Sequence, residues 1–240
     1  MNSEKQTDFS KEVQDIQSHT SSYAHNREFR AYWLGFTEEA RNSRAQTWRV
    51  FGELLSAVTP SLTGWHILDV GCGDGRNLRA MLEYDARPGD LVGIDVSDAR
   101  FPIGLRINPL VTLKKTNGVT LPFCDNSFDL VTQFVCFSNI PTTALRRQVA
   151  VEIQRVLKPG GYVFWWDLPQ TTAPSDSNVN IEVADYFDWP MRKVRLGLMP
   201  KPSECLCWPR PRGVGFLVKK LVDRFSYSPT YCAALIGPKP

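Results

Sequence analysis

The sequence is short of histidine, of paired cysteines and of long apolar runs, and each shortage narrows the range of functions. Its 240 residues include three histidines and six cysteines, and no two cysteines have the CxxC spacing of zinc sites and redox motifs. Several cysteines fall inside apolar segments, where a small buried residue fits. We therefore expect reduced, mostly structural thiols and no metal site.

No run of about 18 apolar residues occurs, so no membrane-spanning helix is expected. The N-terminal stretch MNSEKQTDFSKEV is polar and lacks the apolar centre of a secretory signal. The sequence therefore predicts a cytoplasmic protein. With 42% apolar residues the chain can bury one sizeable core, which favours a single domain with additions.

Positive charge is concentrated toward the C-terminus, although the net charge is only +3. Ten Lys or Arg stand against two acidic residues between Pro190 and Pro240. Such a basic region is either a solvated surface or a face that attracts an anionic acceptor or an anionic membrane. An amphipathic helix is predicted over 214–225. Its basic face could contact an anionic membrane surface, and the alternative is that the helix packs on the sheet.

Short apolar strands alternate with helices along the chain. This alternation predicts an α/β, doubly wound fold, with a mainly parallel sheet and helices on both faces. The segments after residue 190 are expected to add two antiparallel strands at the edge of that sheet. The predicted strands are 66–70, 90–96, 110–114, 128–134, 162–167, 192–198 and 231–236, and the clearest predicted helices are 47–58 and 142–156.

The stretch HILDVGCGDGRNLRAML, residues 66–82, places three glycines within five positions between a strand and a helix. A loop of this kind brings bare backbone close to a ligand at the carboxyl end of a parallel strand. A phosphate-binding P-loop would end in Lys-Ser or Lys-Thr, and a dinucleotide fingerprint would need glycine where Arg76 stands. Neither nucleotide motif therefore fits.

Acidic residues around this loop favour a cationic adenosine ligand. Asp69 ends the first strand, Asp74 lies inside the loop and Asp95 closes the second strand. A carboxylate at position 95 is placed to accept hydrogen bonds from two ribose hydroxyls. Carboxylates so close to the loop would repel a pyrophosphate, but they suit an amino group and a sulfonium. The pattern points to S-adenosylmethionine.

Four ordered segments, ILDVGCGDG, GIDVSDARF, TNGVTLPFCDNSFDLVTQF and RVLKPGGYVFWWDLP, resemble the motif series of class I SAM-dependent methyltransferases. The resemblance covers residues 60–170 and implies a Rossmann-like, seven-stranded sheet. It also implies S-adenosyl-L-methionine as cofactor and S-adenosyl-L-homocysteine as product. The cofactor-binding residues that it predicts are Asp69, Gly71, Cys72, Gly73, Asp74, Asp95, Val96, Asn117, Gly118 and Gln133.

The acceptor side departs from the family pattern. Relatives often read EHI or LHH after the fourth strand, and this chain reads FSNI over 137–140. Asp167, after the fifth strand, is the first candidate to take a proton from the acceptor, and the alternative is that it caps the next turn. His25 is the second candidate for taking this proton. The resemblance implies that its segment folds over the cofactor, and the alternative is that it is a surface histidine.

A finer resemblance, carried by FDLVTQFVCFSNI, GGYVFWWDLP and SPTYCAALIGPKP, is to bacterial methyltransferases associated with polysaccharide and lipopolysaccharide assembly. It favours a sugar hydroxyl as acceptor, on a glycan or a lipid-linked saccharide. The alternatives are a non-sugar metabolite, or a SAM-binding regulatory or scaffold protein without transferase activity. A nucleic-acid acceptor is not expected, because no D/N-P-P-Y/F run follows the fourth strand.

The expected organisation has two parts. Residues 1–45 form a polar N-terminal segment and cap, loosely ordered over 1–22. Residues 46–240 form the methyltransferase domain, with a proline-rich insertion on the acceptor side at about 168–212. The sequence contains no feature that indicates whether the protein is a monomer or an oligomer.

Overall fold

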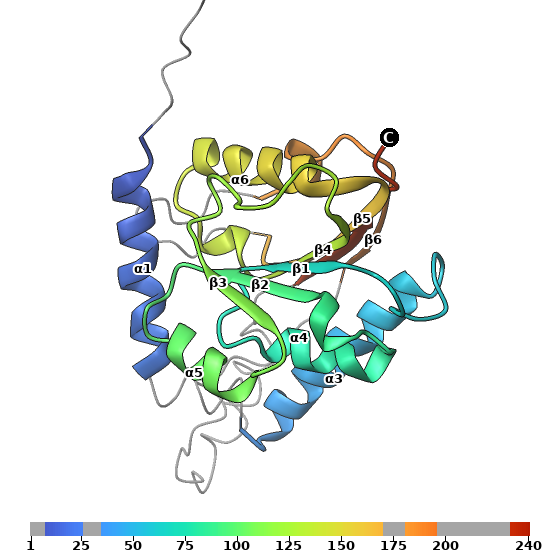
Figure 1. Ribbon diagram of the computed structural model, residues 1–240, viewed down its shortest axis with the longest axis horizontal. Coiled ribbons are helices and arrows are strands. Elements are labelled where there is room, and N and C mark those ends of the chain that lie inside the picture. The colour runs from blue at the N-terminus through green and yellow to red at the C-terminus, as the bar shows by residue number, and fades with distance from the viewer. Residues whose placement is uncertain (1–7, 26–34, 170–180, 196–230) are drawn as a thin grey trace, which may run out of the picture.

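The computed structural model describes residues 8–25, 35–169, 181–195 and 231–240 (Figure 1). Seven strands form one sheet in the order β3-β2-β1-β4-β5-β7-β6. Their bounds are β1 (Ile67–Val70), β2 (Leu91–Asp95), β3 (Thr112–Lys115), β4 (Phe128–Phe134), β5 (Leu157–Asp167), β6 (Met191–Arg195) and β7 (Cys232–Ile236). Only β7 runs antiparallel to its neighbours, β5 and β6. The predicted doubly wound α/β fold with a mainly parallel, seven-stranded sheet is confirmed.

Helices cover both faces of the sheet (Figure 1). The α-helices are α1 (Ser10–His25), α3 (Glu38–Leu55), α4 (Arg76–Met81), α5 (Phe101–Ile107) and α6 (Thr143–Val156). Short 3-10 turns occupy Leu82–Tyr84, Pro88–Asp90, Phe137–Asn139 and Val183–Asp185. Helix α6 packs on one face and α3 and α4 on the other, so the sheet separates two apolar layers.

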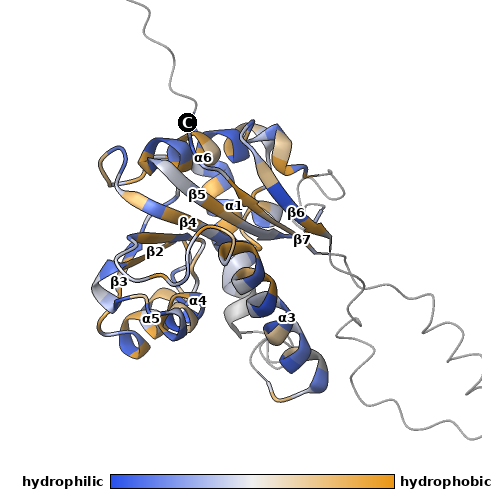
Figure 2. Cartoon of the chain, turned by 90° about the vertical axis from the view of Figure 1, so that its right-hand side faces the viewer, coloured by the Kyte–Doolittle hydropathy of each residue, from blue (hydrophilic) through white to orange (hydrophobic). Residues whose placement is uncertain are grey.

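The two layers follow from the alternation of side chains along the strands. On β5, Trp165 joins the cluster under α6, whereas Phe164 and Trp166 join the cluster under α3. The central strands β4 and β7 are mainly hydrophobic, and the edge strand β6 is largely hydrophilic (Figure 2). Because both faces of the central strands are covered, these segments contain nearly continuous apolar runs.

Strand order reverses between β1 and β4, which are neighbours in the middle of the sheet. The connections that follow these two strands leave their carboxyl ends in opposite directions, and a crevice opens between the two loops. The glycine-rich loop after β1 and the turn after β4 both lie at this edge. The topology therefore places the predicted ligand loop at the position where open α/β sheets bind ligands.

Two N-terminal expectations need correction. Residues 10–22, expected to be loosely ordered, belong to α1, whose Ile16 packs against the core and whose Gln17 Nε2 donates to the backbone oxygen of Val96 at 3.2 Å. Tertiary contacts therefore order a segment whose composition alone is polar. Helix α3 begins nine residues before the predicted 47–58 helix, because Thr37 caps it by accepting from the Ala40 N–H at 3.2 Å.

Other boundaries differ less. Strand β5 starts at Leu157, five residues before its predicted start, and the helical patch expected around 181–187 is a single 3-10 turn. Helix α3 runs through the predicted boundary at residue 45, and the division into two parts stays a prediction. The predicted helix 214–225 and most of the insertion 168–212 lie outside the described residues. Within the described ranges, no helix has the length and apolarity needed to cross a membrane.

Candidate functional site

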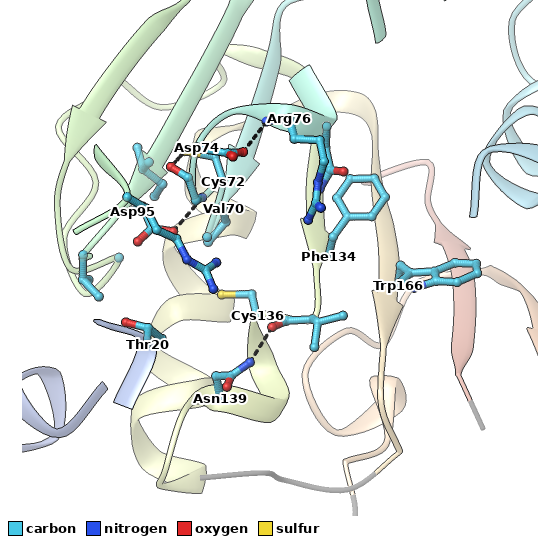
Figure 3. Close-up of a pocket in the computed structure, with 18 of the residues that line it drawn as sticks. Thr20, Val70, Cys72, Asp74, Arg76, Asp95, Phe134, Cys136, Asn139 and Trp166 are labelled. Carbon is cyan, nitrogen blue, oxygen red and sulfur yellow. Dashed lines mark hydrogen bonds between the residues drawn. The ribbon is translucent and has the colours of Figure 1, made fainter. Parts of the chain in front are cut away.

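A cavity of about 450 Å³ opens at the carboxyl ends of β1, β2, β4 and β5 (Figure 3). Helix α1 closes one side of it, with Ile16 and Thr20 in the wall. Eight of the ten predicted cofactor residues line the cavity: Gly71, Cys72, Gly73, Asp74, Asp95, Val96, Asn117 and Gly118. The structure therefore brings together residues from three separate sequence segments around one space.

The glycine-rich loop adopts a backbone that other residues rarely adopt. Gly71 and Gly73 have φ values of 76° and 58°, in the left-handed region. A Cβ atom at Gly71 would lie 2.9 Å from the Cys136 Sγ atom, so a side chain there would collide with the turn after β4. The backbone N–H groups of Gly71 and Cys72 both donate to the Ile94 oxygen at 2.9 Å, which fixes the loop against β2.

Asp95 joins the loop to the end of β2. Its Oδ2 atom accepts from the Gly73 N–H and its Oδ1 atom from the Ser97 N–H, each at 2.7 Å. Each carboxylate oxygen keeps a second lone pair for a ligand. A glycine cradle beside a fixed carboxylate fits an adenosine ribose and a cationic methionine group, as the sequence predicts for S-adenosylmethionine.

The other two predicted cofactor residues lie behind the wall. Asp69 is 1% exposed, and its Oδ1 atom accepts from Thr132 Oγ1 at 2.8 Å, while its Oδ2 atom has no hydrogen-bond partner among the described residues. Burial raises the pKa of Asp69 to about 7, and the charge of Asp95 acts in the same direction. Gln133 is fully buried, and its Oε1 atom accepts from the Cys136 N–H at 3.0 Å.

The cavity thiols are kept protonated. Burial raises the pKa of Cys72 and of Cys136, and nearby carboxylates, Asp95 among them, raise both further. A thiol with a raised pKa is a poor nucleophile, because the thiolate is the reactive form. Neither Cys72 nor Cys136 is therefore placed to act as a nucleophile.

Asp167 is not brought to the cavity. It is fully buried, and its carboxylate accepts from the backbone N–H groups of Phe137, Ser138 and Leu168 at 2.9, 3.3 and 2.8 Å. Burial raises its pKa to about 6, against the effect of these hydrogen bonds. This position matches the alternative that Asp167 caps a turn, because no acceptor in the cavity can touch it directly. His25 ends α1, and its side chain lies outside the described part of the chain.

The turn that Asp167 holds is strained. Val135 has φ = 56°, a conformation that is an outlier for a β-branched residue. Its N–H donates to the Trp166 oxygen and its own oxygen accepts from Asn139 Nδ2, both at 2.7 Å. Val135 lines the cavity. The backbone of β5 and the Asn139 side chain therefore fix a strained backbone at the wall, a combination that is typical of functional sites.

The sequence did not predict the aromatic wall of the cavity, which comprises Trp48, Phe134, Trp166 and Tyr231. The ring centroids of Trp48 and Phe134 are 5.8 Å apart, and Trp166 stacks on Tyr231 at 5.4 Å with an interplanar angle of 25°. Phe134 and Trp166 stand at the carboxyl ends of adjacent strands. That placement was a usable signal, because ligands sit at this edge of a parallel sheet.

Three arginines in the wall, Arg44, Arg76 and Arg100, were also not predicted. Burial lowers the pKa of Arg76, Asp74 opposes this, and the positive charges of Arg100, Arg44 and Arg79 add to the lowering. Other positive charges therefore act on the guanidinium group of Arg76. In the described ranges, no group of three or more His, Cys, Asp or Glu could hold a metal ion.

Comparisons with known proteins agree with the sequence motifs. A family model described as a methyltransferase domain matches residues 68–165. The demethylmenaquinone methyltransferase of Symbiobacterium thermophilum is 36% identical over 123 residues, covering 49% of this chain and 48% of that protein, so the chain spans about half the length of this relative. The demethylmenaquinone methyltransferase of Shouchella clausii is 30% identical over 198 residues, which cover 74% of this chain and 80% of that protein.

Solved structures share the fold at lower identity. The N-methyltransferase NodS of Bradyrhizobium japonicum, in complex with S-adenosyl-L-homocysteine, aligns with a TM-score of 0.62 at 13% identity, over 93% of this chain and 99% of NodS. A phosphoethanolamine N-methyltransferase of Haemonchus contortus aligns with a TM-score of 0.59 at 18% identity, over 98% of this chain and 61% of that one. At these identities the likeness concerns the fold alone.

Proposed function

Because this chain belongs to the class I SAM-dependent methyltransferases, we propose that it transfers a methyl group to a small, planar, non-sugar acceptor bound in the cavity of Figure 3. Its cofactor is S-adenosyl-L-methionine, which supplies the methyl group on a sulfonium centre. The acceptor class is the part of the proposal that the shape of the cavity supports.

The aromatic wall carries this proposal. Trp48, Phe134 and Trp166 come from α3, β4 and β5 and share one cavity with the glycine-rich loop. Flat apolar side chains favour flat ligands, since ring faces stack and bury large areas. The curated relatives are named for demethylmenaquinone, a quinone, which is a planar acceptor of this kind.

The roles proposed for the cofactor side follow from the contacts. Asp95 is fixed by Gly73 and Ser97 with lone pairs directed at the ribose hydroxyls. The loop 71–74 surrounds the methionine half, and Val96, Asn117 and Gly118 line the adenine half. Methyl transfer from a sulfonium is an in-line displacement, so the protein acts mainly by holding the acceptor atom in line with the methyl carbon.

The strained turn has a positioning role in this proposal. Val135 and Asn139 line the cavity, and Asp167 holds the backbone of the turn that follows β4. A fixed backbone at this point limits how far an acceptor can shift along the cavity. We propose that Asp167 positions this turn without touching the acceptor, and His25 stays a proposed proton acceptor.

A sugar hydroxyl is the second candidate acceptor. Trp166 and Tyr231 can stack on a sugar ring as well as on an aromatic ring, but the names of the relatives do not favour a glycan. A regulatory or scaffold protein that binds the cofactor without transfer is the third candidate. The three candidates differ in where a labelled methyl group goes.

The test supplies methyl-labelled S-adenosylmethionine and compares demethylmenaquinone kept reduced, a nucleotide-sugar and lipopolysaccharide mixture, and no acceptor. A quinone must be reduced, because only the quinol ring is a nucleophile. We expect label in the quinol arm, and none with Asp95→Ala. Label confined to the saccharide arm would reverse the acceptor class, and cofactor binding without transfer in any arm would favour the regulatory protein.

A further inference from the structure

The turn after β4, residues 136–140, forms one wall of the cavity. Cys136 and Asn139 lie in this wall (Figure 3), and Ile140 completes it. Two hydrogen bonds close the turn, from the Asn139 N–H to the Cys136 oxygen at 3.0 Å and from the Ile140 N–H to the Phe137 oxygen at 3.1 Å. So short a turn cannot satisfy the N–H groups at its own start or the carbonyl oxygens at its own end. Its shape therefore depends on partners from other elements.

Buried charged side chains hold both ends of this turn. At its start, the Asp167 carboxylate accepts from the N–H groups of Phe137 and Ser138. At its end, Arg146 Nη1 donates to the Ile140 oxygen at 2.7 Å. Arg146 lies on α6, is fully buried and does not line the cavity. A carboxylate and a guanidinium group thus hold opposite ends of one cavity wall.

The guanidinium group of Arg146 is itself fixed by two further residues. Its Nε atom donates to the Tyr186 hydroxyl at 3.0 Å, and its Nη2 atom donates to Thr143 Oγ1 at 2.9 Å. The ring of Tyr186 packs against Phe137 and Trp165, with ring centroids 5.4 and 6.2 Å away. Because its hydrogen-bond partners are held in place, Arg146 presents its Nη1 donor to the Ile140 oxygen in one direction.

A buried guanidinium group is a poor means of stabilising a core. Its transfer from water is costly, and an apolar side chain of similar volume often gives equal or greater stability. Other positions of α6 in the same layer are apolar, among them Leu145, Val149 and Ile153. What distinguishes Arg146 from these residues is a charge-assisted hydrogen bond with a fixed direction, which no apolar side chain makes.

From these contacts we infer that Arg146 is a positioning residue for methyl transfer, which fixes the Ile140 end of the turn as Asp167 fixes its start. The inference rests on the proposed function, since it concerns a wall of the same cavity. Without the Arg146 donor the wall can shift, and a misplacement of about 1 Å can cost about a hundredfold in rate. The glycine-rich loop is held separately by Ile94 and Asp95, so cofactor affinity should not change.

The kinetic test compares Arg146→Met, which removes the donors, with Arg146→Lys, which keeps the charge and one donor group. We expect Arg146→Met to lower kcat/KM for reduced demethylmenaquinone by about tenfold or more, with the Kd for S-adenosylhomocysteine within about twofold of the wild-type value. Arg146→Lys should recover part of the loss. Tyr186→Phe, which removes only the hydroxyl that orients Arg146, should lower kcat/KM by less, and it decides the matter if Arg146→Met does not fold.

Val156→Ala is the matched control for a loss of stability. Val156 is on α6 and fully buried in the same apolar layer, and it does not line the cavity. Its truncation should lower stability without loosening the turn. If Val156→Ala loses as much turnover as Arg146→Met at the same loss of stability, Arg146 is structural and the inference is overturned. Affinity for S-adenosylhomocysteine that falls in step with turnover would overturn it too.

Hydrogen exchange tests the same inference without an acceptor. In the chain loaded with S-adenosylhomocysteine, the amides of residues 137–140 should exchange about tenfold faster in Arg146→Met than in Val156→Ala, as mass spectrometry can measure. Equal exchange in the two variants would overturn the inference. A wild-type chain that transfers no methyl group to the quinol would overturn the proposed acceptor, and the exchange result would then decide whether Arg146 holds the wall.

Discussion

The carboxylate of Asp167 accepts a hydrogen bond from the backbone N–H of Phe137 at 2.9 Å and thereby joins the end of β5 to the turn after β4. The same carboxylate accepts from Ser138 and Leu168, so one buried side chain satisfies three backbone donors. Gln133 satisfies the preceding donor, that of Cys136. The geometry of the acceptor side thus depends on side chains that no acceptor touches.

Asp167→Asn should lower stability and turnover together while cofactor affinity holds. An amide nitrogen cannot accept a hydrogen bond, so at least one buried N–H loses its partner, at a cost of about 1–3 kcal/mol. Urea unfolding, calorimetry with S-adenosylhomocysteine and the labelled-methyl assay measure the three quantities. Lost turnover with unchanged stability would contradict the view that Asp167 acts by holding the turn.

Asp69→Asn should stabilise the chain in a pH-dependent way. The pKa of Asp69 is raised from 3.8 to about 7 in the folded state, so between these values the folded chain keeps a proton that the unfolded chain has lost. The stability contributed by this group is therefore full below pH 4 and falls as the pH rises to about 7. The variant should match the wild type near pH 4 and exceed it above pH 7.

Urea unfolding at pH 4, 6 and 8 measures this difference for Asp69→Asn. Asp85→Asn is the control, because Asp85 is exposed and already has a positive φ of 64°, which asparagine tolerates. A gain for Asp69→Asn that does not change with pH would mean that the buried carboxyl is not the titrating group.

Val135→Gly should be more stable than Val135→Ala by about 1 kcal/mol, the reverse of the usual order of these residues. Both variants remove the side chain, and only glycine accepts the φ of 56° without strain. Comparing the two variants cancels the loss of packing. Thermal unfolding gives the order, and an alanine variant as stable as the glycine one would show that the turn relaxes.

Asp95→Ala should reduce affinity for S-adenosylmethionine by about a hundredfold or more, because it removes an acceptor of two charge-assisted hydrogen bonds. Asp98→Ala is the control, since Asp98 lies three residues further along the same loop, with its side chain exposed and paired to Lys115. Equal affinities for the two variants would contradict the role of Asp95. Circular dichroism checks the fold, because Asp95 also holds the Gly73 N–H.

The sequence predicted the parts of the fold that depend on local pattern. Strand β4 was predicted with its observed bounds, since its apolar run is bracketed by turn residues. The start of α3 was missed although Thr37 with Glu38 is a helix-start signal. Helix α1 was missed because its order comes from contacts with the rest of the chain, such as that of Gln17 with Val96.

The candidate site also has parts that the sequence predicted and parts that it did not. The glycine-rich loop and Asp95 could be predicted, because a short motif carries their chemistry and the topology brings the strand ends together. Of the aromatic wall, Phe134 and Trp166 carried a signal in their place at strand ends, whereas Trp48 and Tyr231 are far apart in sequence and each fits an ordinary apolar pattern. Asp167 looked accessible at a strand end, and only its three backbone partners show that it faces inward.

The order of the sheet also affects how the chain folds during synthesis. Strand β7 is the last of the seven strands in the sequence, yet it lies between β5 and β6. When β6 leaves the ribosome, its partner in the sheet has not yet been made. Tyr231, which immediately precedes β7, arrives with it and completes the aromatic wall. Trp48, Phe134 and Trp166 are translated before Tyr231, so the aromatic wall is complete only when the last strand of the sheet has been made.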